Sequence, residues 1–364
     1  MNTRERLTHL AACSALFEPW TGSFDKESLL EWLEAELGDP AALDRPVPHG
    51  PLRSQALAAP RLLHVVSENT AHAAFQSLLR GLVVGSHNTV KLPSAGLPGF
   101  AEAVAALPRE LASLVTLLPD LPPAWRTQFD ALVVFGTDET LEWFARNTPA
   151  RVRFLPHGQK LSIALVSGDA ETAARLAARD VSRFDQRGCL SLHDVYLTPE
   201  AGLRVPDFAA LLASEMERFE EHSPRAKLNV EEAASISALR EDRRFQAATH
   251  PARCALWESE GSTAWTVIYE ASPELKISPL NRVVFVKPWP ASASTVTARE
   301  ALGEETRHLS TLALHPFVPA RAAEFVALGA TRLCPLGETQ NPSLFWHHDG
   351  LPPLASLTSW VDVG

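Results

Sequence analysis

The chain has 364 residues, in which 33 basic side chains stand against 43 acidic ones, giving a net charge of −10 at pH 7. Apolar residues make up 46% and charged residues 21%, the balance of a globular protein, so collagen-like and disordered chains are excluded. The acidic balance disfavours a nucleic-acid binder, because neutralising phosphates requires surplus Lys and Arg. The longest apolar stretch, residues 71–84, is interrupted by Gln76 and Arg80, so we expect no membrane span.

Length and cysteine content indicate the number of domains and the chemical state of the thiols. At about 150 residues per domain, the length predicts about two domains. The cysteines at positions 13, 189, 254 and 334 are too sparse for a disulfide framework and include no C-x-x-C pair. They are typical of reduced thiols in a cytoplasmic protein, and they raise the question of whether one of them is reactive.

The first organised region follows a proline-containing stretch, residues 36–60, which we interpret as an extended entry segment. Residues 61–66 have the composition of a β-strand, and residues 71–84 predict a helix that Gly85 ends. A second strand is predicted over 88–92, and apolar residues from 100 to 118 then predict another helix.

The same alternation continues along the chain. A third strand over 131–135 leads into a helix for which Asp138 is the expected N-cap, and residues 151–155 form a fourth strand. Strands that alternate with helices predict a parallel sheet with right-handed crossovers, which is an α/β fold. Ligands of such sheets lie beyond the carboxyl ends of the strands.

Familiar phosphate-binding and catalytic motifs are missing from the sequence. No G-x-G-x-x-G follows the first strand, and Gly85 and Lys91 do not form a G-x-x-x-x-G-K-[ST] loop. H-E-x-x-H and G-x-S-x-G are absent as well. From the residues alone, this half is a nucleotide-type α/β domain whose ligand is unspecified.

Cys189 differs from the other three cysteines in its surroundings. It follows Gly188, precedes Ser191 and comes just before a strand-like segment, residues 193–197. A thiol at a turn beside glycine can be exposed and reactive, whereas a small buried hydrophobic residue is the ordinary alternative. The remaining cysteines lie in amphipathic or apolar contexts, and we expect them to be packing residues.

These residues carry a resemblance. The stretch Phe-Asp-Gln-Arg-Gly-Cys-Leu-Ser, residues 184–191, resembles the nucleophile segment of the aldehyde dehydrogenase superfamily in the form used by LuxC-type acyl-CoA reductases. Further segments are similar to that family in the same order: residues 64–69, 76–91, 135–139, 158–162, 329–337, 348–350 and 360–362. The resemblance covers roughly residues 60 to 364.

The resemblance implies an aldehyde dehydrogenase-like fold of two α/β domains. A Rossmann-like cofactor domain without G-x-G-x-x-G is expected over residues 1–156, and a catalytic-cysteine domain over 157–330. Residues 331–364 are expected to cross back, with residues 360–363 forming an edge strand for subunit pairing. A homo-oligomer is implied by the resemblance alone.

The implied reaction is reduction of a fatty acyl thioester to a fatty aldehyde by NADPH. Cys189 is the expected nucleophile, and Asn69 is expected to donate a hydrogen bond to the oxyanion. Without the resemblance, Asn69 is interpreted as a loop cap. Two other functions stay open: an aldehyde dehydrogenase that works in the oxidative direction, acylating or hydrolytic, and a non-catalytic scaffold for an acyl-transfer partner.

The resemblance also assigns cofactor residues. Lys91 occupies the place of a ribose-binding lysine, and Ser94 replaces the glutamate that many NAD-dependent members carry three residues later, which favours NADPH. Gly136 and Thr137 are expected beside the pyrophosphate at a helix N-terminus. The alternative for Lys91 is a solvated side chain at a strand end.

One departure from the family concerns the base. Pro156 stands where hydrolytic aldehyde dehydrogenases have a glutamate, so His157 is a candidate proton acceptor, with a structural histidine as the alternative. Residues 347–349, His-His-Asp, are not expected to bind metal, because adjacent side chains point apart and no second cluster completes the ligand set.

The expected partners follow from this chemistry. The substrate is a fatty acyl-CoA or a carrier-bound acyl thioester, and the family implies an acyl-protein synthetase as a further partner. No nucleic acid, membrane span or metal is expected.

Overall fold

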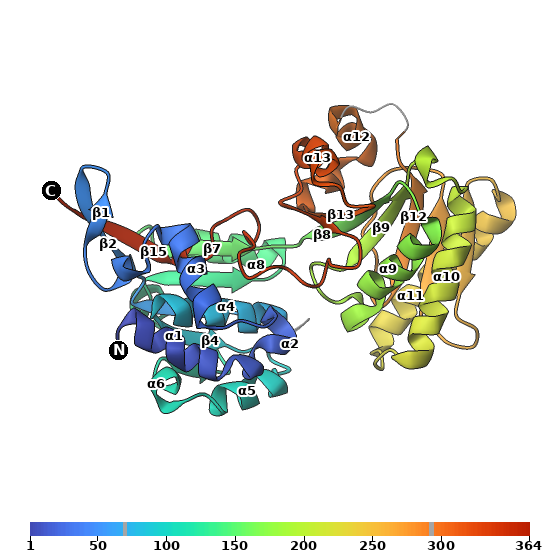
Figure 1. The fold of residues 1–364 in the computed structure, drawn as a ribbon. Coiled ribbons are helices and arrows are strands. Elements are labelled where there is room, and N and C mark those ends of the chain that lie inside the picture. The colour runs from blue at the N-terminus through green and yellow to red at the C-terminus, as the bar shows by residue number, and fades with distance from the viewer. Residues whose placement is uncertain (68–70, 291–294) are drawn as a thin grey trace. The chain divides into compact units, whose positions relative to one another are not determined.

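A computed structural model describes residues 1–67, 71–290 and 295–364. The chain divides into two compact units (Figure 1): residues 1–159 together with 341–364 form unit 1, and residues 160–340 form unit 2. The sequence-based boundary between residues 156 and 157 lies three residues before this division. Each unit is built on its own large sheet, which is wholly parallel in unit 1 and mostly parallel in unit 2.

The sheet of unit 1 has the strand order β5-β4-β3-β6-β7, and all of its pairings are parallel. Its strands are β3 (Arg61–Val65), β4 (His87–Lys91), β5 (Val115–Leu118), β6 (Ala131–Phe135) and β7 (Arg153–His157). The chain starts at the centre with β3, builds outward to β5, and then returns to add β6 on the other side. The topological switch point of unit 1 therefore lies between β3 and β6, where such sheets bind ligands.

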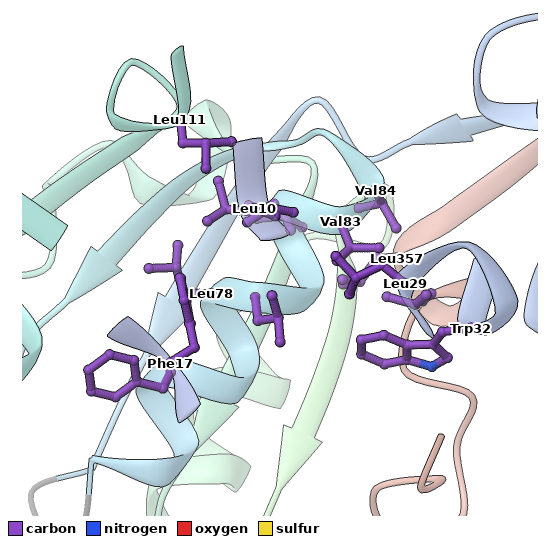
Figure 2. Close-up of a cluster of buried hydrophobic side chains, with 14 of the residues drawn as sticks. Leu10, Phe17, Leu29, Trp32, Leu78, Val83, Val84, Leu111 and Leu357 are labelled. Atoms are coloured by element: carbon purple, nitrogen blue, oxygen red, sulfur yellow. The ribbon is translucent and has the colours of Figure 1, made fainter. Parts of the chain in front are cut away.

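Helices cover both faces of this sheet because its strands are apolar on both faces. Leu62 packs into the cluster formed with α1, α3 and α4, while the next residue, Leu63, packs into the cluster formed with α7 and α8. The helices of unit 1 are α1 (Thr3–Ala12), α2 (Glu18–Thr21), α3 (Lys26–Leu37), α4 (His72–Val84), α5 (Pro98–Ala105), α6 (Arg109–Ala112), α7 (Trp125–Gln128) and α8 (Asp138–Asn147). Figure 2 shows Leu10, Leu29 and Leu78 from three of these helices in one core.

Two details of the predicted elements are wrong. The single helix expected over residues 100–118 is instead α5, α6 and strand β5, because Pro108 occupies the N-cap of α6 and cannot continue a preceding helix. The N-cap of α8 is Thr137, whose Oγ1 accepts a hydrogen bond from the backbone N–H of Thr140 at 3.4 Å, and not Asp138.

The proline-containing entry segment also differs from its prediction. It contains a hairpin of β1 (Val47–His49) and β2 (Leu52–Ala58), and β2 pairs antiparallel with β15 (Thr358–Val363). The three strands form a small sheet of order β1-β2-β15, visible in Figure 1 as a red strand beside blue ones. Local sequence does not show this hairpin, because the strand with which β2 pairs, β15, begins at residue 358.

Unit 2 contains a seven-stranded sheet of order β10-β11-β12-β9-β8-β13-β14, in which only the β10–β11 pairing is antiparallel. Its strands are β8 (Leu161–Val166), β9 (Leu192–Leu197), β10 (Cys254–Glu258), β11 (Thr266–Glu270), β12 (Val283–Pro288), β13 (Leu309–His315) and β14 (Arg332–Pro335). Its helices are α9 (Ala170–Ser182), α10 (Val205–His222), α11 (Val230–Thr249), α12 (Thr295–Leu302) and α13 (Pro319–Ala322). Among the described residues, no helix is long and apolar enough to cross a membrane.

Candidate functional site

Cys189 lies in unit 2, in the short loop that enters β9. Of the four thiols it is the exposed one, whereas Cys13, Cys254 and Cys334 are buried. Burial raises the pKa of all three buried thiols, that of Cys334 to about 11, so they carry little of the nucleophilic thiolate. The exposure of Cys189 therefore agrees with the sequence, which also distinguishes this thiol from the other three.

The loop around Cys189 is tied to its neighbours through the backbone. The hydroxyl of Ser162 donates to the carbonyl oxygen of Cys189 at 3.2 Å, and the N–H of Ser191 donates to the carbonyl of Gly188 at 3.0 Å. Gln340, which is buried, donates from Nε2 to Ser191 Oγ at 2.8 Å. A Cβ atom at position 188 would lie 3.2 Å from Gln340 Oε1, so glycine allows this side chain to close over the turn.

In unit 1 the candidate residues gather at the carboxyl edge of the sheet. Lys91 is the last residue of β4, Phe135 the last of β6, and His157 the last of β7. The carboxyl end of β3 belongs to the same edge, but Asn69 lies outside the described residues. Its expected oxyanion role stays a prediction from the sequence.

His157 is paired with a carboxylate that the sequence did not assign to it. Its Nδ1 lies 2.7 Å from Oδ2 of Asp349, and the two side chains are 10% and 8% exposed. The ring stacks on Phe135, with centroids 4.6 Å apart and planes at 12°. Because the Asp349 carboxylate can only accept a hydrogen bond, Nδ1 of His157 carries the proton and Nε2 is the basic nitrogen. This is the arrangement of an oriented general base.

His348 extends the stack. Its ring centroid lies 4.4 Å from that of His157 and 4.5 Å from that of Trp346, and Arg80 Nη1 donates to its Nδ1 at 3.0 Å. The expectation that adjacent side chains of residues 347–349 point apart is wrong for His348 and Asp349, since one ring nitrogen or carboxylate oxygen from each of His157, His348 and Asp349 lies within 4.8 Å of the others. The signal for this grouping was the His-Asp-Gly segment at 348–350, far from His157 in sequence.

A small pocket opens beside the two imidazoles. It offers a space of about 20 Å³, enough for one water, and includes Ser77 and Arg80 of α4. The other lining residues are Val133, Leu155, His157, His348, Leu351, Pro353, Ser356 and Leu357. The pocket gives water-sized access to the histidine pair and is too small for an acyl chain.

Beneath this edge lies a second polar contact that the sequence did not predict. The fully buried His64 of β3 bridges Ser77 Oγ, 2.6 Å from its Nδ1, and Asn88 Oδ1, 3.0 Å from its Nε2. Burial lowers the pKa of His64 to about 4, so the ring is neutral at pH 7. The contact ties β3, α4 and β4 together just before the loop that follows β3.

The residues expected to hold the cofactor occupy the right edge for a dinucleotide. Lys91 forms no ion pair within the described part of the chain, and Ser94 is exposed in the turn after β4. Gly136 allows close passage of β6 into α8, because a Cβ there would lie 2.9 Å from Thr140 Cγ2. Thr137 is exposed at the start of α8, whose first-turn N–H groups face the ligand edge. These groups fit the phosphates and sugar hydroxyls of a dinucleotide.

Comparison with known proteins decides the family. Residues 5–360 match the family described as acyl-CoA reductase (LuxC). The chain belongs to this family. A long-chain acyl-protein thioester reductase of Vibrio harveyi is 24% identical over 358 residues, covering 92% of this chain and 71% of that protein. Another, of Aliivibrio fischeri, is 24% identical over 275 residues, covering 72% of this chain and 55% of that one.

Solved structures extend the similarity to the fold. An NAD-dependent benzaldehyde dehydrogenase of Corynebacterium glutamicum matches all of this chain and 86% of its own, with a TM-score of 0.65 and 14% identity. The predicted aldehyde dehydrogenase-like fold and LuxC family are thus confirmed. As a LuxC-family member the chain is an acyl reductase, and its fold and chemistry imply a nicotinamide cofactor.

Proposed function

We propose that this chain reduces a long-chain acyl thioester to the fatty aldehyde with NADPH, through an acyl thioester on Cys189. The exposure of this one thiol, in the family's nucleophile segment, carries the proposal. Membership of the LuxC family and the relatives named acyl-protein thioester reductases support the substrate class.

The first half-reaction moves the acyl group to the enzyme. The Cys189 sulfur attacks the thioester carbonyl and gives up its proton to a base, for which His157 is the candidate, and the carrier thiolate leaves and takes up a proton. The backbone N–H of Cys189 and the side-chain amide of Asn69 donate to the oxyanion. Asp349 keeps the His157 proton on Nδ1 throughout.

The second half-reaction releases the aldehyde. A nicotinamide cofactor held at the edge that carries Lys91, Gly136 and Thr137 would supply the hydride that reduces the acyl carbon. The same two donors hold the oxyanion, which collapses as the carbon–sulfur bond breaks and Cys189 leaves as thiolate. The balance is one thioester, one NADPH and one proton converted to one aldehyde, one thiol and NADP⁺.

NADPH is proposed over NADH because Ser94, three residues after Lys91, carries a hydroxyl where many NAD-dependent members have a carboxylate. A 2′-phosphate would meet a cation and a hydrogen-bond donor there. Ser94→Glu is expected to lower the preference for NADPH over NADH by at least about tenfold, measured as the ratio of kcat/KM values, since a carboxylate repels the phosphate. An unchanged ratio would remove Ser94 from cofactor selection.

The acyl adduct gives the direct test. Incubation with palmitoyl-CoA without NADPH, followed by intact-protein mass measurement, is expected to show one added acyl group in the wild type and in Cys254→Ala, but none in Cys189→Ser. Absence of an adduct together with absence of NADPH oxidation would favour the scaffold alternative. Rapid NADP⁺-dependent acyl-CoA formation from aldehyde, with no reduction, would favour the oxidative dehydrogenase.

The remaining expectations complete the proposal. The acyl donor is coenzyme A, an acyl-carrier protein or an acyl-protein synthetase, each of which presents the same thioester to Cys189. The protein acts in the cytoplasm as a homo-oligomer.

A further inference from the structure

Two short segments of unit 2 near Cys189 have left-handed backbone. Residues 184–186 have φ values of 54°, 54° and 61°, and residues 280–282 have 65°, 57° and 66°. None of the six is glycine, although Asp185 and Asn281 tolerate this conformation better than the others. Non-glycine residues keep such angles only where surrounding contacts hold them, and they are concentrated at functional sites. We refer to these segments as the two left-handed triplets.

The side-chain amide of Gln186 joins the triplets. Its Oε1 accepts from the backbone N–H of Val283 at 2.8 Å, and its Nε2 donates to the carbonyl oxygen of Val283 at 2.6 Å. Val283 directly follows the second triplet and begins β12. Because Gln186 is fully buried, losing the amide would leave the N–H of Val283 without this acceptor, whereas the Val283 carbonyl would keep the hydrogen bond from Ser278 Oγ.

The same amide closes the loop that carries the thiol. The second N–H of Gln186 Nε2 donates to the carbonyl of Leu192, the first residue of β9, at 2.7 Å. Cys189 stands at the midpoint of the loop from 186 to 192. Both donors of this amide are thus used, one on the thiol loop and one on Val283, the residue that follows the second triplet.

An ion pair makes a second connection between the triplets. Arg282 Nη2 lies 2.7 Å from Asp185 Oδ1, and the arginine side chain is only 3% exposed. Arg187 Nε also donates to Asn281 Oδ1 at 3.3 Å. Each triplet supplies one member of this ion pair, so neither backbone can relax without breaking contacts to the other.

We propose that Gln186 is a positioning residue for the nucleophile, a role that rests on the proposed function of Cys189. Its amide clamps the two left-handed triplets and closes the 186–192 loop, so that the thiol and the backbone N–H of Cys189 are fixed before substrate arrives. Acyl transfer requires a fixed loop conformation, because the attacking sulfur and the backbone N–H that donates to the oxyanion both belong to Cys189.

Gln186→Met tests the clamp, because it keeps the length of the side chain and removes the amide. The rate constant for acyl transfer from palmitoyl-CoA to Cys189 is expected to fall on the order of 10- to 100-fold, with the Kd for NADPH unchanged. The pH profile of Cys189 alkylation by iodoacetamide, followed by peptide mass, is expected to shift as well. Leu212→Ala, in the α10 core of unit 2, is the control: it lowers stability and keeps both wild-type rates.

The outcomes separate this inference from the function on which it rests. A folded Gln186→Met protein with wild-type acylation and alkylation overturns the clamp. If Gln186→Met does not fold, Gln186→Glu, which keeps the acceptor but loses both donors, and Arg282→Lys give the same test, with wild-type rates again overturning it. A wild type that forms no acyl adduct overturns the proposed function, while the alkylation profile still tests the clamp.

Discussion

The imidazole of His157 is held from several directions, by Asp349 at Nδ1 and by the rings of Phe135 and His348. Stacking restricts rotation of the ring, and the carboxylate selects the tautomer. A histidine in these surroundings has one basic nitrogen in one direction, which is what proton transfer from a thiol requires.

Asp349→Asn is expected to lower the acylation rate constant of Cys189 on the order of 100-fold, because the amide also stabilises the tautomer with the proton on Nε2. Stopped-flow acylation by palmitoyl-CoA measures it. Asp207→Asn, an exposed carboxylate of α10, is the matched control and should acylate at the wild-type rate. Equal rates for the two variants would show that His157 does not depend on Asp349.

His64 has a stability consequence that depends on pH. Its pKa is about 4 in the folded protein against 6.5 unfolded, so the unfolded state binds more protons between these values and stability falls as pH drops through that window. His64→Gln removes this titration. Between pH 7.5 and pH 5 the wild type is therefore expected to lose ~2 kcal/mol more unfolding free energy than the variant, measured by urea denaturation. Parallel pH profiles would refute the neutral, buried state of this ring.

Among the secondary-structure elements, β9 and β12 are joined by a buried ion pair at the centre of unit 2. Lys287 Nζ lies 2.5 Å from Asp194 Oδ1, and neither side chain is exposed. Burial raises the pKa of Asp194 to about 6, even though the Lys287 charge opposes the shift. The charged form of Asp194 is therefore stabilised in the core by the Lys287 ammonium.

Lys287→Met is expected to destabilise the protein by about 3–5 kcal/mol at pH 7.5, because it leaves the Asp194 carboxylate buried without a cation. The double variant with Asp194→Leu should recover most of that loss. Urea unfolding of the single and double variants measures both values. A single variant as stable as the wild type would show that Asp194 is already protonated at this pH.

Elements that depend on local pattern were predictable from the sequence. Strand β6 follows from its continuous run of apolar residues. Helix α4 follows from its apolar pattern and from Gly85, which ends it with a left-handed φ of 91°. The entry hairpin was not predictable, since β2 becomes a strand by pairing with β15. Residues 100–118 do not form one helix because Pro108 cannot continue a helix from the preceding residues, even though the apolar pattern runs through it.

The candidate site divides in the same way. Cys189 and His157 stand out through local context and family resemblance. Asp349 and the amide of Gln186 do not, because their roles exist only once distant segments meet. Sequence spacing carries no information about which carboxylate reaches a given imidazole 192 positions away.

At the scale of the whole molecule, β15 bears on assembly. It ends the three-stranded sheet of unit 1 and exposes Trp360, Val361 and Val363. An exposed apolar edge strand is a template for pairing with another chain, which supports the proposed homo-oligomer.

Val361→Lys is expected to shift the sedimentation coefficient toward that of the monomer, because a charge on the edge strand opposes strand pairing. Ser359→Lys, on the same strand but at a polar position, is the comparison and should disturb assembly less. Circular dichroism checks that both variants fold. An oligomer that survives Val361→Lys with full stability would place the interface elsewhere.

The return of residues 341–364 to unit 1 has a consequence for biosynthesis. These residues leave the ribosome after all of unit 2, yet they supply both Asp349 and β15 to a unit whose other strands were made first. During translation the small sheet thus stays one strand short, and the His157 imidazole waits for its carboxylate. A nascent chain that stalls within unit 2 already contains Cys189 but lacks Asp349, so the hydrogen bond that orients His157 forms only after the last residues have been made.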